Sequence, residues 1–163
     1  MLRLHKLLEI VGILAILVLI IGLYMFYMKT DFRNFLGGKN ETPILLFNEK
    51  VPLRVSIART RAELEQGLGG RETLSETEGM LFVFPEVGYH RIWMSGMKFS
   101  IDIAWVDENG VIVDIKENVS PDTYPEVFEP KVPARYVIEA RAYFLASYSI
   151  GIGDRVTLPR EAL

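Results

Sequence analysis

Two hydrophobic patterns divide the chain. Residues 10–28 read IVGILAILVLIIGLYMFYM, an unbroken apolar run without a charged side chain. A helix of this length crosses the hydrocarbon core of a bilayer, which is about 30 Å thick, because each residue adds about 1.5 Å. Residues 1–30 are therefore predicted to form a transmembrane signal anchor. The alternatives are a cleaved signal peptide and a buried core helix.

The sequence around this run favours the anchor. The run is longer than the apolar part of a usual signal peptide, and its end, Tyr24 to Met28, offers no small-residue cleavage site. Basic residues on its two sides nearly balance, so their distribution does not fix the orientation. Since a single N-terminal anchor before one large domain is usually translocated, we expect a single-pass membrane protein with its domain outside the cytoplasm.

The second pattern is strand-like and follows a short polar stretch. Residues 31–42 include Gly37-Gly38 and are predicted to form a juxtamembrane linker, which leaves residues 43–163 as one soluble domain. Short β-prone segments dominate it, at residues 44–47, 53–58, 79–84, 89–94, 99–106, 111–119, 134–140 and 153–158. Helices are expected after the capping box at 60–63 and within 141–149. The predicted fold is α+β and β-dominated, with about seven short strands in a curved sheet or partly closed barrel and two short helices.

The composition narrows the possible functions. Of the 18 basic and 21 acidic side chains, five and two lie in the first forty residues, so the rest carries 13 against 19, a charge of −6. This balance argues against nucleic-acid binding, which needs Lys and Arg to neutralise phosphate. The chain has no cysteine, which excludes disulfides and thiolate sites. His90 is the only histidine after the leader, so no histidine-rich metal centre and no cofactor is expected.

An acidic residue interrupts the most apolar strand. Asp102 lies among Phe, Ile, Ala and Trp residues, before the Asn109-Gly110 pair that favours a tight hairpin turn. Counting back from a two-residue turn places Val106 opposite Val113. Further along the same face, the count places Asp102 opposite Glu117. Like charges directly opposite each other are destabilising, so this pair would need a cation, a shared proton or water.

Two interpretations of the acidic pair remain open. In the first, an arginine completes a polar pocket around the two carboxylates. The candidates are Arg135, which shares a strand face with Glu139, and Arg71, which follows the first helix. Such a pocket would bind a small ligand or a hard cation, or support acid and base roles for the two carboxylates. In the second, the carboxylates are salt-bridged anchors that fix the strands, or they lie at a solvated end of the sheet. For the pair itself, the structural interpretation is favoured.

Several motifs together resemble a known family. They are RAELEQGLGGR at 61–71, GMLFVF at 79–84, Trp93-Met94, Ile101-Asp-Ile103, residues 107–110, PARYVIE at 133–139 and GDRV at 153–156. Their order over residues 52–158 is similar to that of domain-of-unknown-function family 192. The resemblance implies a β-rich domain, commonly behind a signal or membrane anchor, with no settled biochemical activity. Residues that match motif positions of that family are Arg71, Asp102, Arg135 and Glu139.

The chain also departs from the usual pattern of that family. Members usually continue Trp-Met with Lys-Asn-Thr and place Pro-Leu before the aspartate, whereas this chain has Ser95-Gly96-Met97 and Ser100-Ile101. Many members carry cysteines in the loop at residues 120–133, where this chain has none. If those groups bind a ligand in relatives, this chain binds a different ligand or none.

These observations predict a binding or accessory module that contacts a small envelope molecule or an envelope protein. Its expected ligand-binding residues are Arg71, Trp93, Met94, Asp102, Glu117, Arg135 and Glu139. Trp93, Met94 and Met97 would line an apolar mouth, although core packing is the favoured interpretation for these three residues. An enzyme is less favoured; it would be a hydrolase or lyase with Asp102 and Glu117 as its acid and base. A structural subunit of a membrane complex is a further alternative, and it predicts an exposed apolar patch without a pocket.

Overall fold

The computed structural model describes residues 19–22 and 42–163. The second range forms one compact unit by itself. The predicted transmembrane helix within residues 1–30 and the predicted linker at 31–42 lie outside the described residues, except for 19–22 and Thr42. Within the described ranges, no helix has the length and apolar character needed to cross a membrane.

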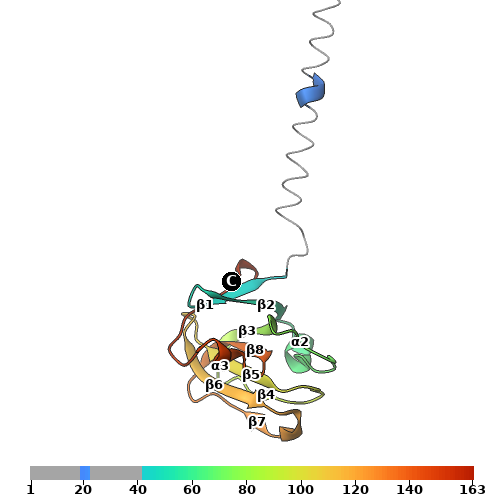
Figure 1. Ribbon diagram of the computed structural model, residues 1–163. Helices are drawn as coiled ribbons and strands as arrows, with labels where there is room; N and C mark the ends of the chain where they lie inside the picture. Colours follow the sequence, from blue (N-terminus) through green and yellow to red (C-terminus); the bar gives the residue numbers. More distant parts are fainter. Residues whose placement is uncertain (1–18, 23–41) are drawn as a thin grey trace, which may run out of the picture. The chain divides into compact units, whose positions relative to one another are not determined.

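A curled seven-stranded sheet, shaped like half a barrel, dominates the domain (Figure 1). Its strands are β1 (Ile44–Phe47), β2 (Val51–Ala58), β3 (Glu78–Gly88), β5 (Ile101–Val106), β6 (Ile112–Val119), β8 (Ala134–Arg141) and β9 (Val156–Thr157). They are ordered β6-β5-β8-β3-β2-β1-β9 across the sheet. Neighbouring strands are antiparallel except for the parallel pair β2 and β3. The predicted β-dominated fold with a curved sheet of about seven strands is confirmed.

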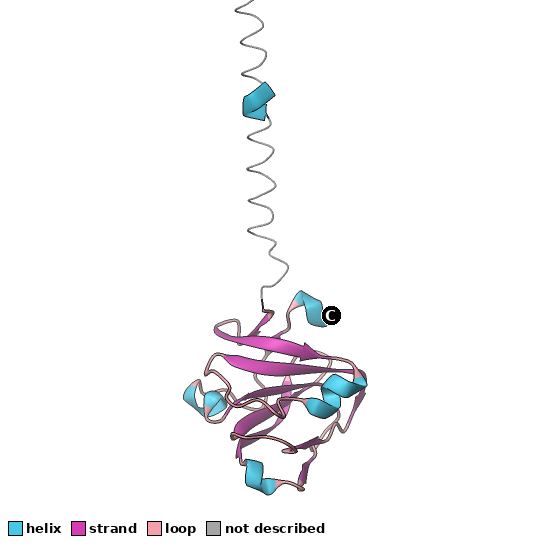
Figure 2. Ribbon diagram, turned by 90° about the vertical axis from the view of Figure 1, so that its right-hand side faces the viewer, coloured by secondary structure: helices cyan, strands magenta, loops and turns pink. Residues whose placement is uncertain are grey.

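Short elements surround this sheet (Figure 2). They are β4 (Ile92–Trp93), β7 (Val127–Phe128), α2 (Arg61–Gln66), α3 (Phe144–Ser147) and two 3₁₀ helices, η1 (Pro121–Thr123) and η2 (Arg160–Ala162). β4 and β7 pair with each other as a separate two-stranded sheet. The helix expected within residues 141–149 is confined to α3, because Tyr143 has a left-handed backbone with a φ of 70° and cannot continue a regular helix.

Apolar side chains pack on both faces of the sheet. In β5, every residue is buried; Ala104 belongs to one cluster, and Ile103 and Trp105 belong to another. Successive strand residues point to opposite faces, so a strand buried on both sides must be apolar at nearly every position. The first cluster includes Phe144 of α3, and we call it the α3-side cluster. The second includes Leu68 from the loop after α2, and we call it the α2-side cluster.

One predicted strand boundary is wrong for a local reason. The apolar segment at residues 79–84 predicts a strand that ends before Pro85, but β3 continues through Pro85 to Gly88. Pairing with β8 is irregular between Val83 and Gly88, so the missing N–H of Pro85 interrupts no regular ladder hydrogen bond. Pro85 therefore lies within β3 without ending it.

Candidate functional site

Asp102 holds three backbone segments together. Its side chain is buried, with 1% exposed. Oδ1 accepts hydrogen bonds from the backbone N–H groups of Asn118 at 2.8 Å and Tyr143 at 3.1 Å. Oδ2 accepts a hydrogen bond from the N–H of Leu145 at 3.0 Å. These bonds tie β5 to β6 and to the turn that opens α3, so Asp102 is a structural anchor; its partners are backbone N–H groups, however, and not the salt bridge or the solvated sheet end that the favoured interpretation predicted.

The predicted pairing of two carboxylates does not form. Val106 pairs with Ile112 rather than with Val113, because the hairpin turn is longer than the two residues assumed. A second irregularity interrupts the ladder at Asp102. There Asp102 is buried, whereas Glu117 is exposed. Between the two irregularities the count from the turn is correct, since Ala104 pairs with Ile115 as it places them, and it fails at Asp102 because the second irregularity shifts the register there.

Arg135 lies on the opposite face of the sheet from Asp102. Asp102 pairs with Ala140 of β8, and paired residues in a ladder point to the same face. Arg135 and Glu139 alternate with Ala140 and therefore point to the other face. The guanidinium of Arg135 donates a hydrogen bond to the backbone carbonyl of Pro85. The expectation that Arg135 neutralises Asp102 is therefore wrong.

Glu139 is an unusual carboxyl group. It lies on β8, paired with Met80 of β3 and Ile103 of β5, and is only 4% exposed. Burial raises the pKa of Glu139 to about 8, although a hydrogen bond from the backbone of Leu68 and the charge of Arg71 both lower it. The carboxyl group is therefore mostly protonated at neutral pH. Its Oε2 is buried and has no hydrogen-bond partner within the described part of the chain.

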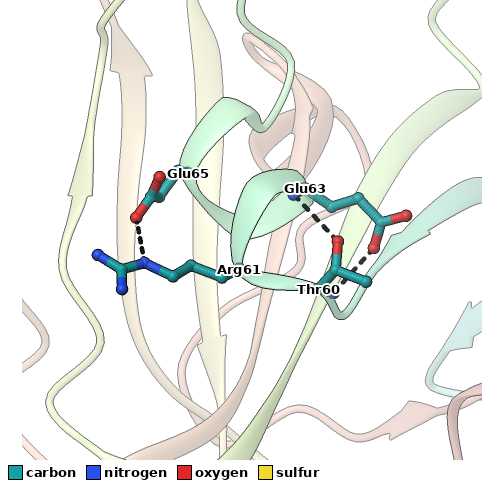
Figure 3. Close-up of polar contacts among 4 residues, drawn as sticks. All are labelled: Thr60, Arg61, Glu63 and Glu65. Carbon is teal, nitrogen blue, oxygen red and sulfur yellow. Dashed lines mark hydrogen bonds and ion pairs between the residues drawn. The ribbon is translucent and has the colours of Figure 1, made fainter.

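The helix α2 forms one side of a pocket beside Glu139. The hydroxyl of Thr60 accepts a hydrogen bond from the N–H of Glu63 at 3.3 Å, and the carboxylate of Glu63 accepts one from the N–H of Thr60 at 2.9 Å (Figure 3). This capping box fixes the start of the helix. Gly67 follows the last helical residue with a φ of 54°. A Cβ there would lie 3.2 Å from the Phe82 ring, which is a tight contact, and 3.7 Å from Glu139 Oε2, so the glycine allows α2 to end close to both side chains.

The pocket lies between α2, the loop that follows it, and β4. Its lining includes the apolar side chains of Leu64, Phe82 and Met97. Trp93 also lines the pocket and is 40% exposed, whereas Glu139 is buried. The pocket is open to solvent, and the space that a water-sized group can occupy in it is about 20 Å³, enough for about one such group. The pocket therefore combines apolar walls, an exposed aromatic ring and one buried acid.

The structure brings two of the predicted ligand-binding residues, Trp93 and Glu139, to this pocket. Met94 is 1% exposed and packs in the α2-side cluster, which is the core alternative named for it. Arg71 donates a hydrogen bond to the hydroxyl of Ser56 at 3.0 Å and acts on Glu139 through its charge. The sequence predicted Glu139 as a ligand-binding residue, but it did not indicate that its carboxyl group is buried away from solvent.

Comparisons with known proteins agree on the fold. A structure from Sinorhizobium meliloti 1021, named a "putative transcription regulator", is 28% identical, with a TM-score of 0.64, and the match covers 69% of this chain and 84% of that chain. A structure of a protein of unknown function from Novosphingobium aromaticivorans DSM 12444 is 26% identical, with a TM-score of 0.66, and the match covers 70% and 83%. The comparison with curated proteins gave no match. Residues 44–158, well over half of the chain, match the family described as "DUF192: Uncharacterized ACR, COG1430", and the protein therefore belongs to the DUF192 family.

Proposed function

We propose that this domain is a binding module for a small ligand, which enters the pocket between α2 and β4 and reaches Glu139. The observation that supports the proposal is the buried Oε2 of Glu139, which has no partner among the described residues and lies at an apolar pocket with Trp93 in its wall. Leaving a buried polar atom unpaired costs about 1–3 kcal/mol. A ligand that brings the complementary group would recover this free energy. Apolar walls with a few well-placed polar groups are typical of small-ligand sites.

An enzyme that uses Asp102 and Glu117 finds no support in the geometry. A catalytic acid and base must reach the same substrate. Asp102 uses both oxygens to accept backbone hydrogen bonds, whereas Glu117 is an exposed residue of β6. The two carboxylates therefore have no common site.

The name of the Sinorhizobium relative does not lead us to propose DNA binding. Residues 41–163 carry 13 basic and 19 acidic side chains, a charge of −6. Binding to the phosphate backbone requires clustered positive charge. A small ligand is therefore the better proposal for this chain.

We further propose that residues 10–28 anchor the domain to a membrane and that the domain lies outside the cytoplasm, where an envelope molecule would be its ligand. The support is the uncharged apolar run itself. The full-length chain is expected to remain with the membrane fraction after alkaline carbonate extraction. Protease added to cells with a permeable outer layer should degrade the domain, with a cytoplasmic protein as the intact control. Release of the chain by carbonate would contradict the anchor.

Replacement of Trp93 by alanine is expected to weaken ligand binding without unfolding the domain. Trp93 is 40% exposed, so it contributes less to core packing than the buried Trp105. An aromatic contact contributes about 0.5–1.5 kcal/mol, so the affinity should fall between about twofold and tenfold. A thermal-shift screen of the full-length chain against envelope metabolites would identify ligands, and calorimetric titration would measure the loss.

Tyr89→Ala is the matched control for this experiment. Tyr89 is also an exposed aromatic residue, with 53% exposed, but it does not line the pocket. This variant should keep the parent's affinity. If Trp93→Ala also binds every identified ligand as tightly as the parent does, the ligand does not use this pocket.

A further inference from the structure

We propose that the group which meets Glu139 is a hydrogen-bond acceptor oxygen, from a carboxylate or an amide, carried by a small ligand with an apolar body. This inference rests on the proposed function and assigns the chemistry of its ligand. It follows from the protonation of the buried acid, from the charges around it and from the shape of the pocket.

Oε2 of Glu139 is the atom that can donate to a ligand. A pKa of about 8 keeps this carboxyl group mostly neutral at pH 7, and a neutral carboxyl group carries one O–H donor. The backbone of Leu68 already donates to the carboxyl group, and Oε2 is the oxygen left without a partner among the described residues. An acceptor oxygen placed against Oε2 completes the hydrogen bonding of the neutral acid. An ammonium group would instead require the carboxyl proton to leave.

Few charged groups face Glu139 from the elements packed against it. The residues paired with it, Met80 on β3 and Ile103 on β5, are not ionisable. The loop after α2 contributes Arg71, whose positive charge lowers the pKa of Glu139 without bringing it below neutral pH. Among the described residues, the charge that acts on the pKa of Glu139 is positive, which favours an electron-rich oxygen over a cation.

The charged residues in the pocket wall are already paired. Oε1 of Glu65, on α2, lies 2.8 Å from Nε of Arg61. Nε of Arg91, just before β4, lies 3.3 Å from Oε2 of Glu129. Each pair is nearly neutral as a unit, and all four side chains are substantially exposed to solvent. The pocket wall therefore contributes little negative electrostatic potential that would attract an ammonium group.

The shape of the pocket limits how the ligand reaches Glu139. Its accessible space of about 20 Å³ admits one group of about the size of a water molecule. A carboxylate or amide oxygen at the end of a narrow group has this size. The half-buried side chains of Leu64 and Met97 then face the rest of the ligand, and the ring of Trp93 is available for stacking.

Three probes with the same ring separate the possible chemistries: benzoate, benzamide and benzylamine. Each would be titrated into the full-length chain while tryptophan fluorescence is followed. The chain has two tryptophans, of which Trp93 is 40% exposed and Trp105 is fully buried, so a response reports chiefly on Trp93. Benzoate or benzamide should bind at about pH 6, and benzylamine should not. Tighter binding of benzoate would indicate a carboxylate ligand, and tighter binding of benzamide would indicate an amide.

The pH dependence tests the donor directly. The affinity of the parent for its acceptor probe should fall about tenfold between about pH 6 and pH 9, because about one Glu139 in ten remains protonated one pH unit above a pKa of about 8. Glu139→Gln should abolish this pH dependence, because its amide donates a hydrogen bond but does not ionise. Glu139→Met removes the donor and should weaken binding at every pH.

Three outcomes overturn the inference. If only benzylamine binds, and more tightly as the pH rises through 8, the pocket takes a cation; the proposed binding function would stand, and the assigned ligand chemistry would fail. If none of the three probes alters the fluorescence, the pocket holds only water, and the inference fails together with the proposed site. An acceptor probe whose affinity does not change between pH 6 and pH 9 would also contradict the role of Glu139.

Discussion

Replacing Glu139 with glutamine is expected to make the domain several kcal/mol more stable than the parent at about pH 8, but not at about pH 4. The pKa of Glu139 rises from 4.5 to about 8 on folding, mainly because of burial. Between these two values the unfolded chain releases the proton and the folded chain keeps it. The free energy of unfolding of the parent therefore falls as the pH rises through this window. The full loss is on the order of 5 kcal/mol, since each pKa unit corresponds to about 1.4 kcal/mol.

Urea unfolding of the two chains at a series of pH values measures this effect. The difference between the two free energies should be small below about pH 4.5, grow up to about pH 8 and then level off. Glu117→Gln is the matched control, because Glu117 is an exposed glutamate in the same sheet. Its difference from the parent should stay near zero at every pH. If the free energy of unfolding of the Glu139→Gln chain changes with pH in the same way as that of the parent, the carboxyl group of Glu139 is not held neutral.

Asp102→Asn is expected to destabilise the domain by about 3 kcal/mol. The carboxylate accepts three backbone hydrogen bonds, one of them at Oδ2 from Leu145. An asparagine keeps one acceptor oxygen, and its NH₂ group would face a backbone N–H wherever it points. A buried unsatisfied donor costs about 1–3 kcal/mol, and the loss of a charged acceptor adds to this cost.

Urea unfolding at neutral pH and amide hydrogen exchange would test this prediction together. The N–H groups of Tyr143 and Leu145 should lose protection, because Asp102 is their hydrogen-bond acceptor. Asp122→Asn is the control, because Asp122 is an exposed aspartate of η1. An Asp102→Asn chain with the stability of the parent and full protection at these two amides would rule out the anchor role.

Local signals along the chain were sufficient for most of the fold. The capping box at Thr60 and Glu63 predicted the start of α2, because its hydrogen bonds connect residues only three apart. The apolar segments at residues 44–47 and 79–84 predicted β1 and most of β3. The membrane anchor at residues 10–28 remains a prediction from composition, since it lies almost entirely outside the described residues.

The positions of the acidic side chains needed the tertiary structure. The sequence by itself identified Asp102 as an acid in an apolar strand, but the irregularities in the β5–β6 ladder decided that Glu117 does not face it. The burial of Glu139 depends on its neighbours β3 and β5 and on the loop after α2, which are distant in sequence. Strand-residue alternation reports which side chains of one strand share a face. This alternation does not indicate which strand is the neighbour, where a bulge changes the register, or how completely a side chain is shielded from water. All three depend on contacts between segments that are far apart along the chain.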